Sequence, residues 1–180
     1  MTSNLEKALG FKLKAFNYLY VLCDYETLLK RNITLENFVN LCKRNNVKIV
    51  QYRDKISSLQ EQKTNLLYLK SQLNIPIIIN DKIELIEFAD GLHIGQEDLQ
   101  AINKDKKLAI KLIRLKIKDK LLGLSTHNEI EILEANELHL DMIGLGAYKN
   151  TSTKDVSTIL GDRISYLAKI SKHPVCAIGG

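Results

Sequence analysis

PIIINDKIELIEFADGLHIGQEDL, residues 76–99, contains two short apolar runs, and polar residues follow each of them. The first run, residues 76–79, leads into Asn80-Asp81, and the second, residues 91–94, leads into Gln96-Glu97-Asp98. Continuous apolar runs, as opposed to alternating ones, are typical of parallel strands that are covered on both faces. This stretch therefore predicts two parallel strands with polar groups at their carboxyl ends.

Five further apolar runs have the same character. They span residues 18–23, 47–52, 121–124, 142–145 and 174–178. Helical patterns lie between them, with Thr34 as a candidate N-cap and with capping-box spacing in Ser58 and Glu61 and in Asn128 and Glu131. Repeated strand–helix units predict a parallel α/β sheet, either doubly wound or closed as a barrel.

The position of the polar residues separates these two folds. A TIM (β/α) barrel builds its active site from loops at the carboxyl ends of many strands, and here almost every run ends in charged or hydroxyl residues. A doubly wound sheet usually carries a glycine-rich turn after its first strand, whereas this first run leads into Cys23-Asp24-Tyr25. The pattern favours a TIM (β/α) barrel.

The length of 180 residues predicts one barrel domain over residues 1–180. Only seven strands are counted, and Gly179-Gly180 stands where an eighth strand–helix unit should begin, so that unit is expected to be missing. An open barrel edge exposes unpaired backbone. We therefore expect a neighbouring subunit in a homo-oligomer, or the N-terminal segment, to cover the seam.

Composition restricts the class of protein. The net charge of +5 suits a protein that handles anionic substrates, and no stretch approaches the ~20 apolar residues of a membrane span. Cys23, Cys42 and Cys176 lack the spacing of a disulfide framework or a zinc site, and the N-terminus does not resemble a signal peptide. We expect a cytoplasmic protein without a membrane partner.

Basic residues gather between residues 104 and 118, where spacings of three and four place them on one stripe of a predicted helix. The stripe comprises Lys104, Lys107, Lys111, Arg114 and Lys118, with Leu108, Leu112 and Leu115 on an adjacent stripe. A solvated face is the favoured interpretation and a docking surface is the alternative. Few aromatic side chains are interleaved to stack on bases, so no nucleic-acid partner is expected.

A candidate anion site follows the second run. Gln51, Arg53 and Lys55 alternate along a strand and point the same way, which suits a phosphate or diphosphate. An ion pair of Arg53 with Asp54 at the surface is the alternative. Two candidate magnesium ligands, Asp81 and Asp98, follow adjacent strands, and helix N-capping is the alternative for each.

Hydroxyl and imidazole groups follow the fifth run. Ser125 could donate to phosphate and His127 could move a proton, while Thr126 or Asn128 could instead cap the next helix. His93, inside an apolar run, is expected to be a core histidine. Further candidate phosphate contacts after later runs are Thr151, Thr153, Lys154, Gly179 and Gly180.

In these motifs the chain resembles the thiamine phosphate synthase family, which is close to the thiazole tautomerase-like proteins. The resemblance covers nearly the whole chain and is carried by QYRDK at 51, IINDK at 78, GLHIGQEDL at 91, GLSTH at 123, TSTK at 151 and AIGG at 177. It implies a TIM barrel transferase that condenses hydroxymethylpyrimidine diphosphate with thiazole phosphate and releases diphosphate. The implied mechanism is dissociative and uses Mg²⁺.

The resemblance also implies a role for each matching residue. The diphosphate would be held by Gln51, Arg53, Lys55, Asn80 and Lys154, with Ser125 nearby, and catalysis would rest on Arg53, Lys55, Ser125 and Lys154. Asp81 and Asp98 would bind Mg²⁺. Thr151, Thr153 and Gly180 would contact the thiazole phosphate.

The chain departs from the family pattern at three points. The residues that follow the eighth strand in the family, where they help to bind the thiazole phosphate, are expected to be absent. Residues 147–150 replace a glycine-proline-aromatic sequence, and the long segment 99–120 is expected to extend one helix. Two alternatives to the synthase are an isomerase that uses His127 as acid and base, and a non-catalytic relative that binds a thiamine precursor or a protein partner. Because Asp81, Asp98 and Lys154 are all present, the synthase is preferred over the isomerase.

Overall fold

A computed structural model of the chain describes residues 3–9, 18–150 and 159–179. The chain forms two compact units, residues 1–92 and residues 93–180. The single domain that the length predicts stays a prediction. Among the described residues, no helix has the length and apolar character needed to cross a membrane.

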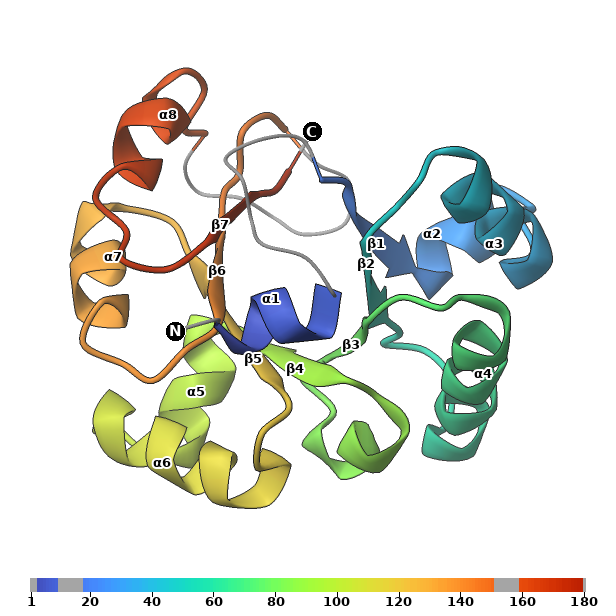
Figure 1. Cartoon of the computed structure of the whole chain (residues 1–180), viewed down its shortest axis with the longest axis horizontal. Coiled ribbons are helices and arrows are strands. Elements are labelled where there is room, and N and C mark those ends of the chain that lie inside the picture. The colour runs from blue at the N-terminus through green and yellow to red at the C-terminus, as the bar shows by residue number, and fades with distance from the viewer. Residues whose placement is uncertain (1–2, 10–17, 151–158, 180) are drawn as a thin grey trace. The chain divides into compact units, whose positions relative to one another are not determined.

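The first unit consists of parallel strands that alternate with helices (Figure 1). Its strands are β1 (Tyr20–Asp24), β2 (Ile49–Arg53) and β3 (Ile77–Asn80), and its helices are α1 (Asn4–Leu9), α2 (Tyr25–Lys30), α3 (Leu35–Arg44), α4 (Leu59–Gln72) and the 3-10 helix η1 (Ile83–Phe88). The strands pair in the order β1-β2-β3, with Val21 opposite Val50 and Val50 opposite Ile77.

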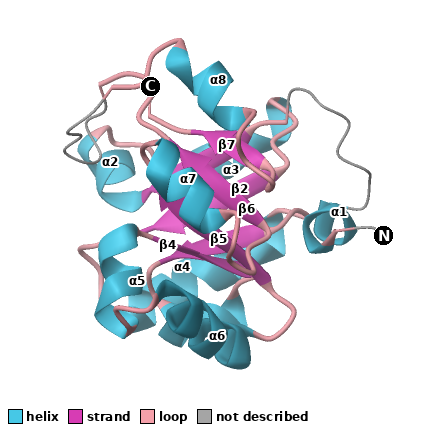
Figure 2. Cartoon of the chain, turned by 90° about the vertical axis from the view of Figure 1, so that its left-hand side faces the viewer, coloured by secondary structure: helices cyan, strands magenta, loops and turns pink. Residues whose placement is uncertain are grey.

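The second unit repeats this plan. After β4 (Gly91–Ile94), where the chain passes from one unit to the next, its strands are β5 (Leu121–Thr126), β6 (Met142–Leu145) and β7 (Val175–Ala177). Its helices, drawn in cyan in Figure 2, are α5 (Gln96–Ile102), α6 (Lys106–Ile117), α7 (Glu129–Ala135) and α8 (Arg163–Ala168). The strands pair in parallel in the order β5-β6-β7.

All seven predicted strands are confirmed. Two of them, Gly91–Ile94 and Met142–Leu145, have the predicted bounds, and the other five differ at one or both ends. In both units each strand pairs with the next strand in the chain, without the reversal of strand order that marks a doubly wound sheet.

The predicted helix starts are also confirmed. The Thr34 side chain accepts a hydrogen bond from the backbone N–H of Asn37 at 3.1 Å and caps α3. Ser58 and Glu61 form a complete capping box at the start of α4. Asn128, the second of the two candidates, caps α7 by accepting from the backbone N–H of Glu131 at 2.9 Å.

The expectation of one extended helix across residues 99–120 is wrong, because two helices occupy this segment. Asn103 has an extended backbone and ends α5. Asp105 then starts α6, and its carboxylate accepts hydrogen bonds from the backbone N–H groups of Lys107 and Leu108 at 2.8 and 3.2 Å. A good N-cap inside a helical pattern thus begins a second helix.

The predicted basic stripe on this segment needs a correction too. Lys104 precedes α6 and Lys118 is its C-cap, so neither lies within the helix. The side chain of Arg114 is largely buried, and its guanidinium donates to the Asp141 carboxylate at 2.6 Å and to the carbonyl oxygens of His139 and Lys120 at 3.0 and 2.8 Å. Arg114 therefore ties α6 to the strands, and only the lysines of the stripe face solvent.

The two faces of the first sheet have different surroundings. Tyr52 is fully buried, its ring lies 6.3 Å from that of Tyr25 in α2, and its hydroxyl accepts from Asn65 of α4 at 2.9 Å. Tyr52 therefore points toward the helices. Its neighbours Gln51 and Arg53 point to the opposite face, because successive strand residues alternate.

Candidate active site

The first group of candidate residues lies at the carboxyl end of the sheet in residues 1–92. Leu22 of β1 is in register with Gln51 of β2, and Asp24 is in register with Arg53. Gln51 is also in register with Ile78 of β3, so Asn80, two residues further, shares its face. The three strands thus bring polar side chains to one face.

The guanidinium of Arg53 forms an ion pair with the carboxylate of Asp24. Both side chains are largely buried, with 15% and 8% of their surface exposed. Asp24 also caps α2 by accepting from the backbone N–H of Thr27 at 3.0 Å. Burial raises the pKa of Asp24, but the hydrogen bonds from Thr27 and Arg53 and the charge of Arg53 outweigh it and hold the pKa below its ordinary value.

The alternative of an ion pair between Arg53 and Asp54 at the surface is wrong. Asp54 is buried and points the other way, where it accepts from the hydroxyl of Tyr52 at 2.8 Å. Its second oxygen accepts from the backbone N–H groups of Ile56 and Ser57 at 3.0 and 2.9 Å. Asp54 therefore shapes the loop after β2 and leaves Arg53 to Asp24.

A chain of hydrogen bonds crosses the three strands. The hydroxyl of Tyr20 donates to Gln51 Oε1 at 2.7 Å, and Gln51 Nε2 donates to Asn80 Oδ1 at 2.6 Å. Asn80 Nδ2 in turn donates to the Asp81 carboxylate. Because each amide is used at both of its ends, the orientations of Gln51 and Asn80 are set together.

Asp81 does not cap a helix. The residue before η1 is Lys82, and no side chain caps that helix. Asp81 itself has a left-handed backbone with φ of 61°, a conformation that Asn and Asp adopt more readily than other residues with side chains. Lys55, the remaining candidate in this unit, lies in the loop after β2 with an exposed side chain.

In residues 93–180 the second candidate carboxylate is Asp98, in the first turn of α5. The N-cap of this helix is Gly95, so Asp98 is not a cap either. A Cβ atom on Gly95 would lie 3.0 Å from the Asp98 carboxylate, which therefore folds back over the glycine. No hydrogen bond or ion pair engages Asp98 among the residues that the structure describes.

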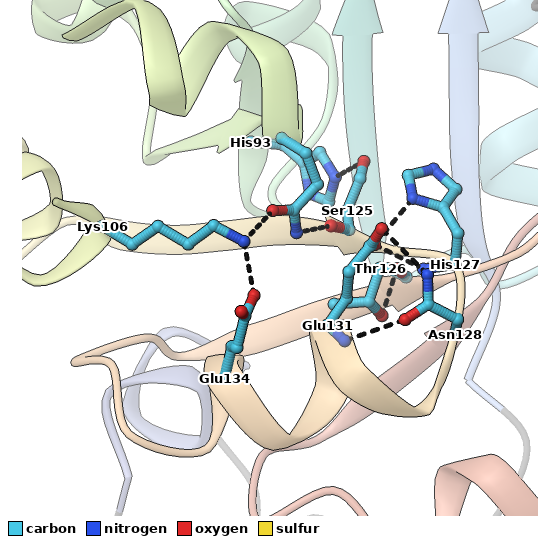
Figure 3. A network of polar contacts seen from close by, with 10 residues as sticks. His93, Lys106, Ser125, Thr126, His127, Asn128, Glu131 and Glu134 are labelled. Atoms are coloured by element: carbon cyan, nitrogen blue, oxygen red, sulfur yellow. Dashed lines mark hydrogen bonds and ion pairs between the residues drawn. The ribbon is translucent and has the colours of Figure 1, made fainter. Parts of the chain in front are cut away.

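Ser125 lies near the carboxyl end of β5 and is held by a buried histidine. The hydroxyl of Ser125 and Nε2 of His93 are 3.0 Å apart (Figure 3). The His93 ring occupies the space over two glycines, since a Cβ atom on Gly123 would lie 2.5 Å from it and one on Gly144 3.0 Å. His93 is 5% exposed, which confirms the expectation of a core histidine.

His127 directly precedes the N-cap of α7 and forms a carboxylate–imidazole pair with Glu131 in the first turn of that helix. Its Nδ1 lies 2.8 Å from the Glu131 carboxylate, which also accepts from the backbone N–H of His127 at 2.9 Å (Figure 3). Thr126 is not a helix cap, because its buried hydroxyl donates to the carbonyl oxygen of Gly144 at 3.1 Å. The geometry at His127 is that of an imidazole oriented by a carboxylate.

Gln96 and Lys106 form a chain of hydrogen bonds that ends at the backbone of Ser125. Gln96 Nε2 donates to the Ser125 carbonyl oxygen at 2.7 Å, and Lys106 Nζ donates to Gln96 Oε1 at 2.9 Å. Lys106 also forms an ion pair with Glu134 of α7 at 2.5 Å (Figure 3). Of the five remaining candidates, Gly179 follows β7 with a φ of 82°, and its carbonyl oxygen accepts from the backbone N–H of Lys149 at 2.8 Å. The other four, Thr151, Thr153, Lys154 and Gly180, lie outside the described residues.

The structure identifies functional candidates that the sequence analysis missed. Asp24 is the last residue of β1, and polar residues at strand ends are the signal that identified the other candidates, so the same signal could have identified Asp24. Tyr20 gave no such signal, because a tyrosine in an apolar run looks like part of the core. The spacing of Asn128 and Glu131 predicts a capping box, but the Glu131 carboxylate contacts the backbone N–H and the imidazole of His127 instead.

Asp81 and Asp98 each carry the kind of oxygen ligand that Mg²⁺ prefers. Neither Asp81 nor Asp98 serves as a helix cap, and Mg²⁺ is commonly bound through one or two carboxylates together with waters and substrate phosphates. Within residues 3–9, 18–150 and 159–179, no group of three or more His, Cys, Asp and Glu side chains is placed to hold a metal. Such a cluster is not required for this mode of binding.

A family model and individual sequence relatives of the chain carry the same description, thiamine phosphate synthase. The family model described as thiamine monophosphate synthase matches residues 19–180. The thiamine-phosphate synthase of Persephonella marina is 32% identical over 170 residues, which cover 90% of this chain and 76% of that protein. The thiamine-phosphate synthase of Clostridium botulinum is 36% identical over 170 residues, which cover 90% of this chain and 74% of that protein.

A solved structure matches as well. The thiamine phosphate pyrophosphorylase from Pyrococcus furiosus superimposes with a TM-score of 0.71 at 22% sequence identity, covering 91% of this chain and 75% of that chain. At this identity the likeness establishes the fold. The predicted fold class, an α/β fold of the TIM (β/α) barrel type, is confirmed.

Proposed function

The chain belongs to the thiamine monophosphate synthase family, and from this premise we propose that it condenses hydroxymethylpyrimidine diphosphate with thiazole phosphate to give thiamine phosphate and diphosphate. It is then a transferase of thiamine biosynthesis that acts on small phosphorylated substrates. The observation that carries the proposal is the polar face at the carboxyl end of β1, β2 and β3. There Gln51, Asn80 and Asp81 are joined by hydrogen bonds.

The first chemical step leaves negative charge on the departing diphosphate. A guanidinium offers a planar fork to phosphate oxygens, and the Arg53 guanidinium is already held in place by Asp24. Lys55 in the adjacent loop would add a mobile point charge, and Gln51 and Asn80 would add amide donors. Cations positioned before the bond breaks stabilise the charge that develops in the transition state.

The metal would act on the same charge. When bound, Mg²⁺ neutralises diphosphate oxygens, and by family motif Asp81 and Asp98 are the carboxylates that would hold it. Ser125, oriented by His93, would donate to the same substrate. We assign Lys154 to the diphosphate and Thr151, Thr153 and Gly180 to the thiazole phosphate by family motif alone.

The test is formation of thiamine phosphate by the purified chain supplied with both substrates and Mg²⁺. Asp81→Asn and Asp98→Asn remove one charge each and keep the size of the side chain, and Asn tolerates the left-handed backbone at position 81. Each variant should lose most turnover and should shift the Mg²⁺ requirement to higher concentration. Asp105→Asn is the matched control, because Asn keeps the α6 cap while the charge change is the same.

Two results would contradict the proposal. The synthase assignment fails if the chain forms no product under conditions in which the Persephonella marina relative forms it. The metal assignment fails separately, if both aspartate variants keep the wild-type rate and the wild-type dependence on Mg²⁺. Circular dichroism of each variant distinguishes loss of function from loss of fold.

A second candidate function is isomerisation of the thiazole, and the pairing of His127 with Glu131 favours it. A carboxylate that holds Nδ1 fixes the imidazole so that Nε2 faces away from the pair and can exchange a proton. His127→Gln should abolish an isomerase while it spares a synthase that needs no general base. Assays of both reactions with this variant separate the two functions.

We also infer a cytoplasmic setting for the reaction. All three cysteines, Cys23, Cys42 and Cys176, are free thiols. Free thiols are the rule in a reducing compartment, where disulfides are rare.

A further inference from the structure

Helix α6 has two apolar faces. One face packs against the rest of the molecule and consists of Ala109, Ile110, Ile113 and Ile117, all of which are buried. On the other side Leu108, Leu112 and Leu115 are 42, 44 and 71% exposed. A surface helix of a globular protein normally carries polar residues opposite its core face, so this second apolar stripe needs another explanation.

Lysines border the exposed leucines on both sides. At about 100° per residue, Lys107 and Lys111 fall on one side of the leucine stripe and Lys116 on the other. The helix Lys106–Ile117 contains no acidic residue, so its outer face is apolar in the middle and cationic at both edges. A partner surface that fits it has exposed apolar side chains bordered by carboxylates.

Helix α7 of the same chain has that character. Ile130 and Leu133 are 69 and 49% exposed, and Glu129, Glu134 and Glu137 lie beside them on the exposed surface. Lys106 at the start of α6 contacts Glu134 near the end of α7 at 2.5 Å, so this contact joins the two helices. A cationic apolar surface and an anionic apolar surface are therefore neighbours.

We propose that a second copy of this chain docks here, with α6 of each protomer against α7 of its partner. Neighbouring surfaces of opposite charge on one chain become self-complementary about a twofold axis, which brings both pairs together at once. A stable interface of standard size needs about 800 Å² from each partner, more than one helix of 12 residues presents, so both helices have to contribute.

The ion pairs within each chain do not prevent this exchange. Glu134 and Glu137 are 48 and 60% exposed where they meet Lys106 and Lys172, and exposed pairs contribute little. Their carboxylates can therefore turn to lysines of a partner. The surface lies on α6 and α7 and includes no residue of β1 or β7.

The experiment is analytical ultracentrifugation of the intact chain over a range of concentrations. The wild type should sediment as a monomer–dimer equilibrium. Lys107→Glu with Lys111→Glu, and separately Glu129→Lys with Glu137→Lys, should each raise the dimer Kd at least about a hundredfold, because like charges then meet twice. An equimolar mixture of the two double variants should restore the dimer, because both helix pairs then meet opposite charges.

The control is Lys43→Glu with Arg44→Glu in α3, which makes the same change in net charge on exposed residues elsewhere and should leave the dimer intact. A wild-type chain that stays monomeric at every concentration reached would overturn the proposal. The proposal is also overturned if either double variant dimerises like the wild type, or if their equimolar mixture does not form the dimer. Binding of the monomer to anionic vesicles through the α6 lysines, without dimerisation, would assign the surface to lipid and overturn it as well.

Discussion

Asp24 and Arg53 occupy the last register position of β1 and β2, and their side chains form a buried ion pair at the carboxyl end of the sheet. Asp24 also caps α2. One carboxylate thus connects the start of a helix to the cation that we assign to the diphosphate. This connection makes Asp24 a positioning residue that needs no contact with substrate.

Asp24→Asn is expected to keep the cap and to release Arg53, because Asn is as good an N-cap as Asp. Loss of orientation at a cation that acts on the leaving group should lower kcat/KM at least about tenfold, since small misplacements at a reacting centre reach ~100-fold. Steady-state kinetics with varied pyrimidine diphosphate measures the effect. Thr27→Ala, which keeps the carboxylate and the ion pair, should retain near wild-type kinetics.

The same carboxylate predicts a pH dependence of stability. A carboxyl group whose pKa is lowered by folding stabilises the native state at pH values above its unfolded pKa of ~3.9, and this contribution is lost as the pH falls through the native pKa. The difference in the free energy of unfolding between wild type and Asp24→Asn should therefore shrink below about pH 4. Urea titrations at a series of pH values measure it. A difference that grew toward acid would contradict the lowered pKa.

Arg114 and Asp141 form the second buried ion pair, with 11 and 6% of their side chains exposed. The carboxylate also accepts from the backbone N–H of Leu122 at 2.8 Å, and removal of Arg114 leaves this buried carboxylate without its cation. Arg114→Ala is expected to lower the free energy of unfolding by about 3–5 kcal/mol. Lys30→Ala, which breaks an exposed pair with Glu26, is the matched control and should change stability little.

The close approach of the His93 ring to Gly123 can be tested by a double-mutant cycle on the free energy of unfolding. Gly123→Ala places a methyl group where the imidazole lies, and overpacking of a buried site costs about 1–3 kcal/mol. In a His93→Ala background the same change should be at least ~1 kcal/mol less destabilising, because the clash is gone. Chemical unfolding of the four proteins gives the interaction energy. An energy near zero would mean that the ring does not occupy this space.

The three thiols are expected to be alkylated slowly, since Cys23 and Cys42 are buried and the partly exposed Cys176 has a raised pKa. Burial raises the pKa of Cys42 to about 11 and that of Cys176 to about 12, and it also raises the pKa of Cys23. At pH 8 a thiol with a pKa of about 12 is ~0.01% ionised, against roughly a quarter for an ordinary cysteine. Mass spectrometry after iodoacetamide treatment should find slow labelling in the native chain and fast labelling in urea.

The strands and the first half of the site could be predicted from the sequence because both depend on local patterns. Continuous apolar runs such as residues 76–79 report strands buried on both faces, and the polar residues after them report the carboxyl edge of the sheet. The side-chain alternation that grouped Gln51 with Arg53 is likewise local. These features can be predicted without knowing which distant segments of the chain are in contact.

The features that the sequence analysis missed depend on distant partners. Asp24 and Asp54 are both available to Arg53 in sequence, and only the strand register and the loop after β2 decide between them. In sequence Arg114 belongs to the basic stripe of residues 104–118. In the structure its side chain turns inward because it pairs with Asp141, 27 residues away. The break between α5 and α6 was overlooked because a cap at Asp105 lies within an otherwise continuous helical pattern.

The left-handed backbone at Asp81 restricts how this position can evolve. Of the residues with side chains, Asn and Asp enter that conformation readily, and glycine does so without penalty. Glutamate, the other residue able to supply a carboxylate, is disfavoured by about 1–2 kcal/mol there. A lineage that gave up the metal would therefore be expected to drift to asparagine or glycine at this position, and a lineage that retains it has a single charged residue to select.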